Sequence, residues 1–376
     1  MKEFVVDRIL NRDDICNLKK TANTLLAGVL AGRNQVFYGR RNTGKTSLIR
    51  SVVFPEYRKK HKAGITIFAD LIGVRSLDDI SQRIMLGIGQ ALAEKFPTQS
   101  KIKTIVKGLL NLQPKIALDP QTGEIGLVLS SKATGTSGLQ EVFKEISYLH
   151  KNSGVVVAFD EFQDVALVEG AEASLRSCLQ EVAKSLPVIV LGSKKHMLSQ
   201  IFAAPGAPLA NWGVDIEIPD IETSEYREYI NERLQPHGIT IGLDETLWLQ
   251  QKMRFIPEAI NMTCISLIDV KGDHTRVTRE LIAVALQNLL DTRRSRFEEY
   301  LLHFSNAEIS FLRTLAHGEP NNKLTGVEFL RNTRLSSGGV IKIIKKLENA
   351  AVIYRGYAGY FLSDPLLAEY LFRYKS

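Results

Sequence analysis

Residues 39–50 read GRRNTGKTSLIR, and they follow the short β-favouring run NQVFY at 34–38. The stretch fits the pattern G-x-x-x-x-G-K-[ST], whose four fixed positions are Gly39, Gly44, Lys45 and Thr46. Between a strand and a helix, this spacing is the signature of a loop whose backbone N–H groups surround a polyphosphate. The strand pattern before it and the helix pattern after it argue against a chance match. The stretch therefore predicts a nucleotide-binding α/β fold.

The residue types of this loop suit ATP and Mg²⁺ as cofactors. The two glycines allow backbone angles that a Cβ would forbid, and they let the chain approach phosphates closely. Lys45 supplies a point charge for the β- and γ-phosphates. Thr46 offers a hydroxyl to Mg²⁺, and the helix that begins there turns its positive end toward the anion.

Composition limits the class of protein. The chain has 376 residues, of which 44% are hydrophobic and 24% charged, as in an ordinary globular protein of two or three domains. No apolar run in the printed sequence approaches the ~18 residues of a membrane helix, and the N-terminus lacks the features of a signal peptide. We therefore expect a cytoplasmic protein with no membrane partner. The net charge of +7 is compatible with nucleic-acid binding without establishing it.

Five strand-like apolar runs alternate with helical patterns through residues 1–220. They are NQVFYG (34–39), GITIFAD (64–70), GVVVAFD (154–160), PVIVLGS (187–193) and GVDIEIP (213–219). Near-continuous apolar runs are typical of a parallel sheet that is covered on both faces and binds its ligand at the carboxyl ends of the strands. We predict an α/β fold of the P-loop NTPase type, an α/β/α sandwich. Two alternating segments within 114–131 predict a β-hairpin inserted at the edge of the sheet.

An acidic pair follows the third of these runs, in GVVVAFDEFQD (154–164). Asp160 ends the apolar strand, where a carboxylate can hold Mg²⁺ together with Thr46, and Glu161 follows where it can polarise the attacking water. Adjacent acids at the mouth of a buried strand are costly unless a metal ion or water uses them. Ser193 ends the next strand and is expected to orient that water or to sense the γ-phosphate. The predicted catalytic residues are Lys45, Asp160, Glu161 and Ser193.

The chain after residue 220 reads as two further domains. Residues 221–300 are mostly helical in pattern and predict a helical lid. In residues 301–376, SSGGVIKIIKKLENA (336–350) has an apolar helical face, and AVIYRGYAGYFLSDP (351–365) reads as a two-stranded hairpin. A helix followed by a tight hairpin predicts a winged-helix domain.

Basic residues make double-stranded DNA a candidate partner of that domain. It has ten Lys and Arg residues against six Asp and Glu residues. The candidate phosphate contacts are Lys342, Lys345, Lys346 and Arg355. Equally open is a winged helix that packs on the nucleotide domain or on other protein subunits, with its lysines in solvent.

Together these motifs resemble the archaeal-type ATPases of the AAA+/STAND lineage, which are themselves similar to origin-recognition initiator ATPases. The resemblance rests on the loop, on the D-E-F-Q box at 160–163, on VIVLGSKKHM at 188–197 and on the terminal winged helix. The family loop reads G-P-R-R-T-G-K-T-S. The resemblance therefore adds nucleotide-binding residues to the loop, namely Arg41, Thr43 and Ser47.

Two further nucleotide contacts follow from the resemblance. The family's R-x-x-[EL] element near the adenine is approximated here at Arg12, and its Gly-x-Pro lid motif keeps the proline at Pro257. The lid motif loses its glycine, which argues against a nucleotide-sensing role for Arg254.

The sequence thus favours a Mg²⁺-dependent ATPase that couples its nucleotide state to a winged helix. The alternative is a slow nucleotide-dependent switch or scaffold whose winged helix binds protein. Glu161 favours hydrolysis, and the altered lid motif favours the switch.

Overall fold

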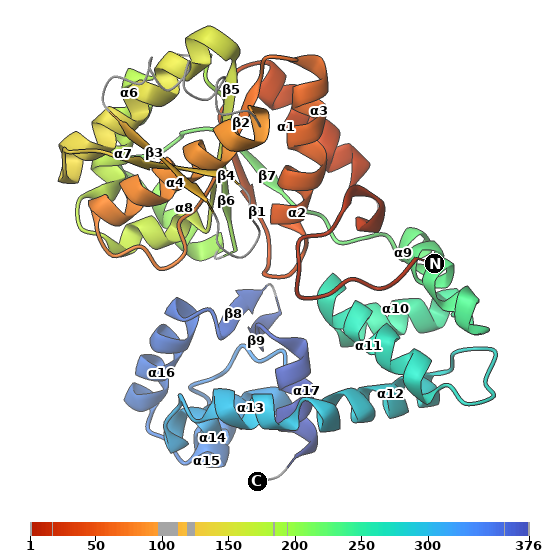
Figure 1. Ribbon diagram of the computed structural model, residues 1–376. Helices are drawn as coiled ribbons and strands as arrows, with labels where there is room; N and C mark the ends of the chain where they lie inside the picture. Colours follow the sequence, from red (N-terminus) through yellow and green to blue (C-terminus); the bar gives the residue numbers. More distant parts are fainter. Residues whose placement is uncertain are drawn as a thin grey trace. The chain divides into compact units, whose positions relative to one another are not determined.

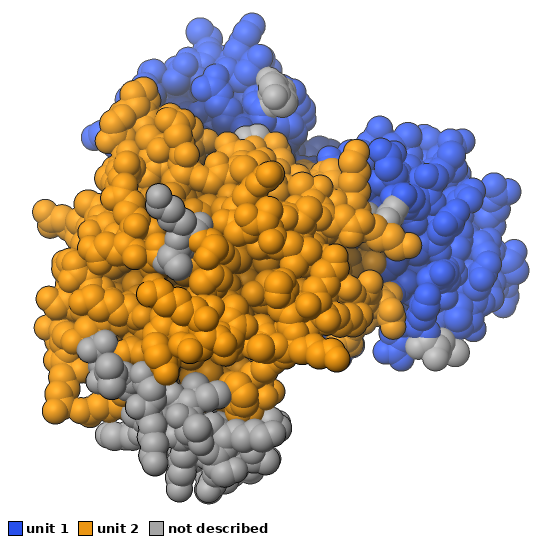
Figure 2. Space-filling view, turned by 90° about the horizontal axis from the view of Figure 1, so that it is seen from above, with its two compact units in different colours: residues 1–8, 41–43, 220–376 blue, residues 9–40, 44–219 orange. Residues whose placement is uncertain are grey.

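The computed structural model of the chain describes residues 2–16, 18–96, 112–118, 125–182, 185–193, 195–356 and 358–374. It divides into two compact units (Figure 2). Unit 1 comprises residues 1–8, 41–43 and 220–376, and unit 2 comprises residues 9–40 and 44–219. The division into three domains at 1–220, 221–300 and 301–376 stays a prediction.

Unit 2 is built on a five-stranded parallel sheet with the order β2-β5-β6-β1-β7 (Figure 1). Its strands are β1 (Gln35–Tyr38), β2 (Ile65–Asp70), β5 (Val155–Asp160), β6 (Val188–Gly192) and β7 (Val214–Glu217). Each strand lies within one of the five predicted apolar runs. The predicted parallel sheet is confirmed.

Helices cover both faces of this sheet. One face carries α1 (Lys19–Leu30), α2 (Lys45–Leu48) and α3 (Phe54–Lys60), and the other carries α4 (Leu77–Lys95), α6 (Gly135–Ser153), α7 (Ala171–Glu181) and α8 (Lys195–Phe202). Along β5, Val156 and Ala158 pack with the α1–α3 side, whereas Val157 and Phe159 pack with the α4–α8 side. Because neither face meets water, the strand is apolar at every position up to Asp160. The α/β/α sandwich is confirmed.

The helix after the phosphate loop contains a wide turn. Between α2 and α3 the chain forms a π-helical segment, Ile49–Val53, so that helical structure runs from Lys45 to Lys60. Pro55 has no N–H to donate to the carbonyl of Ser51, and a widened turn accommodates the missing bond.

The hairpin expected within 114–131 is present, but its predicted place is wrong. Strands β3 (Gln113–Leu118) and β4 (Ile125–Ser130) pair antiparallel as a separate two-stranded sheet. This sheet packs on α4 instead of extending the edge of the five-stranded sheet. The approach is close, since a Cβ on Gly89 would lie 2.1 Å from the carbonyl oxygen of Leu127. Residues 119–124 of the insertion lie outside the described residues.

Unit 1 is mainly helical. Its helices are α9 (Thr223–Leu234), α10 (Leu243–Lys252), α11 (Pro257–Val270), α12 (Arg279–Thr292), α13 (Arg294–Leu301), α14 (Asn306–His317), α15 (Val327–Thr333), α16 (Ser337–Asn349) and α17 (Pro365–Arg373). Strands β8 (Ile353–Gly356) and β9 (Gly359–Leu362) form an antiparallel hairpin after α16. The name winged helix for this part of the chain stays a prediction.

Two further features of unit 1 are its last helix, α17, and the N-terminal segment of residues 2–8. Helix α17 begins at Pro365, and its N-cap residue Asp364 accepts hydrogen bonds from the N–H groups of Leu366 and Leu367. The N-terminal segment also belongs here, because the carbonyl of Glu3 accepts a 3.0 Å hydrogen bond from Nε of the buried Arg233. Within the described part of the chain, no helix is both long and apolar enough to span a membrane.

Candidate nucleotide-binding site

The loop after β1 places a buried lysine at the carboxyl end of the sheet. Gly44 has a φ of 87°, in the left-handed region that favours glycine, and nothing lies within 4 Å of a Cβ built there. Lys45 follows it and is 6% exposed. Its Nζ donates to the carbonyl oxygens of Gly39, at 2.8 Å, and Arg40, at 2.7 Å. The ammonium group thus lies inside the loop.

Thr46 and Asp160 meet beside this lysine, although 114 positions separate them in the sequence. The Thr46 hydroxyl donates to Oδ2 of Asp160 at 2.5 Å, and Oδ1 of Asp160 accepts from the N–H of Glu161 at 2.9 Å. Burial raises the pKa of the Asp160 carboxyl, and the hydrogen bond from Thr46 opposes this rise.

A hydroxyl beside a carboxylate is a donor set that fits Mg²⁺, which prefers oxygen ligands. Among the described residues, no group of three or more His, Cys, Asp and Glu side chains could hold a metal ion. Thr46 and Asp160 would supply two oxygen ligands, and Mg²⁺ usually takes its remaining ligands from water and phosphate in nucleotide sites.

Two side chains, those of Ser193 and Gln163, donate hydrogen bonds to Glu161. Its φ of 48° is unusual for a residue with a Cβ, and such backbone strain is common at functional sites. The Ser193 hydroxyl donates to Oε2 at 2.9 Å and to Oε1 at 3.3 Å. Gln163 donates to Oε2 through its Nε2. Because β6 lies between β1 and β5, Ser193 lies between the phosphate-loop strand and the strand of the acidic pair.

The remaining predicted residues of unit 2, Ser47 and Arg12, join residues 10–12 to the helical stretch 45–60 that follows the loop. The Ser47 hydroxyl accepts a 3.1 Å hydrogen bond from the N–H of Leu10. Arg12 lies in a short 3₁₀ segment, Arg12–Asp14, and its guanidinium pairs with Glu56 on α3. Their direct contacts with a nucleotide stay predictions.

Three other predicted nucleotide-binding residues, Arg41, Thr43 and Pro257, belong to unit 1. Pro257 is the first residue of α11, and its carbonyl accepts a 3.1 Å hydrogen bond from the Tyr226 hydroxyl. Their roles at a nucleotide stay predictions.

Arg254 has a defined place in unit 1. Its guanidinium pairs with Glu319 and donates to the carbonyl of Leu362, at the end of β9. The side chain therefore joins the turn before α11 to the hairpin. Whether Arg254 senses a nucleotide stays a prediction.

The sequence patterns assigned no role to Gln163, although it belongs to the D-E-F-Q box, or to Asp164. Both are buried in a 3₁₀ segment, Phe162–Leu167, and Asp164 accepts a 2.9 Å hydrogen bond from the N–H of Gly73 in the loop after β2. Their position could have revealed them, because two polar residues directly after a core phenylalanine are themselves expected to be near the core.

The candidate DNA-binding residues lie on α16 and β8. Val340 and Leu347 are buried, whereas the side chains of Lys342, Lys345 and Lys346 are exposed. Lys346 forms a 2.6 Å ion pair with Glu308 of α14. Arg355 is exposed on β8, and its guanidinium lies 5.8 Å from the centre of the Tyr360 ring.

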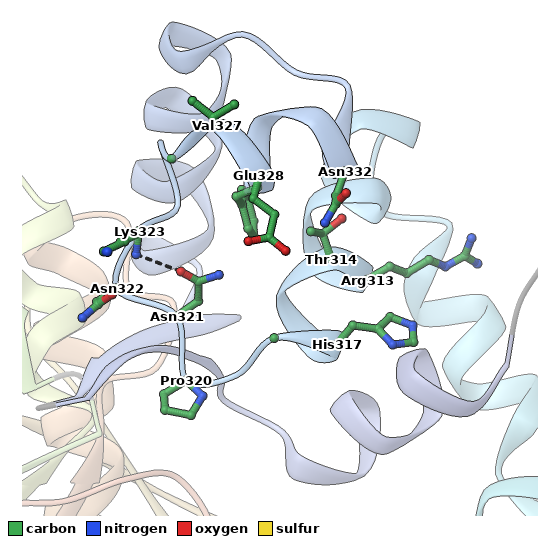
Figure 3. Close-up of a pocket in the computed structure, with 13 residues that line it drawn as sticks. Arg313, Thr314, His317, Pro320, Asn321, Asn322, Lys323, Val327, Glu328 and Asn332 are labelled. Carbon is green, nitrogen blue, oxygen red and sulfur yellow. Dashed lines mark hydrogen bonds between the residues drawn. The ribbon is translucent and has the colours of Figure 1, made fainter.

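A cavity of about 710 Å³ opens between α14, the loop that follows it, and α15 (Figure 3). His317 comes from α14, Asn321 and Lys323 from the loop, and Val327 from α15. The side chain of Val327 is 85% exposed. The cavity thus combines polar groups with an uncovered apolar residue.

No protein-family model matches the sequence, and no curated protein matches it. Solved structures do match. A Walker-type ATPase of Pyrococcus abyssi aligns over 98% of this chain and 99% of its own, with a TM-score of 0.68 and 18% identity. This chain has the fold of a Walker-type ATPase. The ORC2 protein of Aeropyrum pernix, solved as ADPNP and ADP complexes, aligns over 98% of each chain with a TM-score of 0.54 and 13% identity. The likeness confirms the P-loop ATPase fold expected from the sequence.

Proposed function

We propose that this chain binds ATP with Mg²⁺ and hydrolyses it to ADP and phosphate. The observation that carries the proposal is the 2.5 Å contact between Thr46 and Asp160, with the buried Lys45 preceding one partner and Glu161 following the other. Phosphoryl transfer to water needs this set: a cation for the phosphates, oxygen ligands for the metal and a base for the water. The ORC2 structure with bound nucleotides supports nucleotide binding by a chain of this fold.

Lys45, Thr46 and Asp160 would bind ATP and Mg²⁺ with little rearrangement, because Thr46 already contacts Asp160. The Lys45 ammonium exchanges its two loop carbonyls for oxygens of the β- and γ-phosphates. Thr46 and Asp160 hold the metal, directly or through water. When bound, Mg²⁺ neutralises charge that develops on the phosphate oxygens.

In hydrolysis, Glu161 acts as the general base. Its carboxylate accepts a proton from water while the water oxygen forms a bond to the γ-phosphorus. The bond from that phosphorus to the bridging oxygen breaks, and its electron pair leaves with ADP. Ser193 keeps the carboxylate in place through its hydroxyl. A positioned general base contributes about 10²- to 10⁴-fold to such a rate.

The test is Glu161→Gln, which keeps the shape of the side chain and removes the base. We expect kcat for ATP hydrolysis to fall about 10²- to 10⁴-fold while the Kd for ATP stays nearly unchanged. Glu169→Gln is the matched control, because Glu169 is exposed a few residues further along. Wild-type turnover in Glu161→Gln would remove Glu161 from the mechanism.

A second candidate is a nucleotide-dependent switch or scaffold whose C-terminal domain binds another protein. It is favoured by the cavity beside α15, where Val327 is strongly exposed and which none of the three lysines of α16 lines. If the ATPase instead acts on double-stranded DNA, the exposed Lys342 and Lys345 of α16 would contact the DNA phosphates.

A further inference from the structure

Gln163 is a fully buried polar residue that holds the candidate base. Its relative exposure is 0%, and it lies in the 3₁₀ segment that follows Glu161. Its Nε2 donates to Oε2 of Glu161 and, at 3.4 Å, to Oδ1 of Asp164. One amide thus joins the carboxylate proposed as base to the carboxylate that fixes the loop after β2 at Gly73.

The neighbouring strand leaves room for this amide. A Cβ on Gly192 of β6 would lie 2.5 Å from Oε1 of Gln163. Oε1 itself is buried without a hydrogen-bond partner in the described part of the chain. A buried acceptor without a partner is costly, and an apolar side chain of the same length would avoid that cost. The hydrogen bonds that Nε2 donates to Glu161 and Asp164 therefore explain why an amide occupies this buried position.

The hydrogen bonds also distinguish the two oxygens of Glu161. Ser193 and Gln163 both donate to Oε2, whereas Oε1 has the longer contact of 3.3 Å with Ser193. This leaves Oε1 as the better placed oxygen to accept the proton of the attacking water.

We propose that Gln163 is a positioning residue for ATP hydrolysis, which fixes Glu161 by its Oε2 and directs Oε1 to the water. The inference rests on the proposed function. In this role Gln163 acts through Glu161 and not on the substrate itself.

The test is a double-mutant cycle between Gln163→Met and Glu161→Gln. Methionine keeps the length of the side chain and removes the donor. We expect Gln163→Met to lower kcat about 10- to 100-fold, as removal of supporting hydrogen-bond partners commonly does, with the Kd for ATP unchanged. In the Glu161→Gln background the same change should lower kcat no further, because its effect passes through Glu161.

Gln35→Met is the matched control. Gln35 is 1% exposed, its Nε2 donates to the carbonyl of Leu25 at 3.1 Å, and its Oε1 likewise has no partner among the described residues. A glycine, Gly28, makes room for it, but it lies at the start of β1, away from the loop. Gln35→Met should keep the wild-type kcat.

Two results would overturn the inference by itself: a wild-type kcat in Gln163→Met, or losses that multiply in the double variant, as for a structural residue. If Gln163→Met fails to fold, Gly192→Ala is the second test. It leaves Gln163 in the sequence, but its Cβ would push the Gln163 amide away from its present position. A lowered kcat with unchanged ATP affinity supports the inference, and a wild-type kcat overturns it. A wild-type protein that binds ATP without any turnover overturns the proposed hydrolysis, and this inference with it.

Discussion

Asp160 and Glu161 are neighbours in the chain, yet their surroundings differ. Asp160 is buried and accepts hydrogen bonds from the Thr46 hydroxyl and the next N–H group, and burial raises its pKa. Glu161 is less buried, and its carboxylate accepts side-chain donors from Ser193 and Gln163. Two carboxylates in different environments can take different roles, and we propose metal binding for Asp160 and proton transfer for Glu161.

His150 gives a pH-dependent prediction in the same unit. Its Nδ1 lies 3.0 Å from the backbone nitrogen and 3.2 Å from the carbonyl oxygen of Val155, and its Nε2 lies 3.1 Å from the Ser185 hydroxyl. Burial lowers its pKa, and the contact with the Val155 backbone opposes this shift. The folded protein therefore favours the neutral ring, whereas the unfolded chain binds a proton below about pH 6.5. The free energy of unfolding should fall as the pH is lowered through that value toward the depressed folded pKa.

Thermal unfolding at about pH 7.5 and pH 5.5 measures this contribution. We expect a larger loss of Tm in the wild type than in His150→Gln, which retains polar atoms but does not titrate. An equal loss in the two proteins would show that His150 does not contribute.

At this scale the sequence predicted Asp160, Glu161 and Ser193, because each follows an apolar strand. It did not assign a role to Gln163, whose contacts depend on a 3₁₀ turn with no periodic pattern and on the space left by Gly192 of another strand. Such a contact becomes visible when both strands are in place.

Helix α16 is divided into a buried face and an exposed face. Val340 and Leu347 are buried, Ser336 caps the helix by accepting from the N–H of Gly339 at 3.2 Å, and the lysines point to solvent. The ion pair of Lys346 with Glu308 reduces its value as a phosphate contact.

Reversal of the charges at Lys342 and Lys345 tests the DNA-binding candidate. The double change to Glu should weaken binding to duplexes of any sequence and reduce the slope of log K against log salt by about 2. The same reversal at Lys60 and Lys151, both exposed in unit 2, is the control and should leave binding unchanged. A wild-type protein without salt-dependent affinity for DNA would favour the protein-binding candidate.

The type of most elements could be predicted, since strands and helices have distinct apolar periods. The place of the β3–β4 hairpin could not, because an alternating pattern shows that one face is buried but not which element covers it. Leu127 and Leu129 meet α4, and the close approach depends on the missing side chain of Gly89. Helix α17 could have been found from the Asp364–Pro365 pair, a typical helix start.

For the whole molecule, the contacts that carry the proposed chemistry lie within unit 2. They are Thr46 with Asp160, Ser193 with Glu161, and Gln163 with Glu161. The order of the motifs along the chain was enough to predict the sheet that brings them together. The assignment of Phe4 and Val5 to unit 1 was not predictable, since a short apolar segment does not indicate its distant partner.

The most direct test of the account is the affinity for ATP, measured by calorimetry with Mg²⁺ and with EDTA, for the wild type and for Lys45→Ala. Lys60→Ala, at an exposed position on α3, is the control and should bind as the wild type does. The account predicts that the wild type binds ATP, that EDTA weakens binding, and that Lys45→Ala loses about 10- to 100-fold in affinity with its charged hydrogen bonds. A wild-type protein that does not bind ATP in Mg²⁺, or a Lys45→Ala variant that binds it equally well, would contradict the central claim.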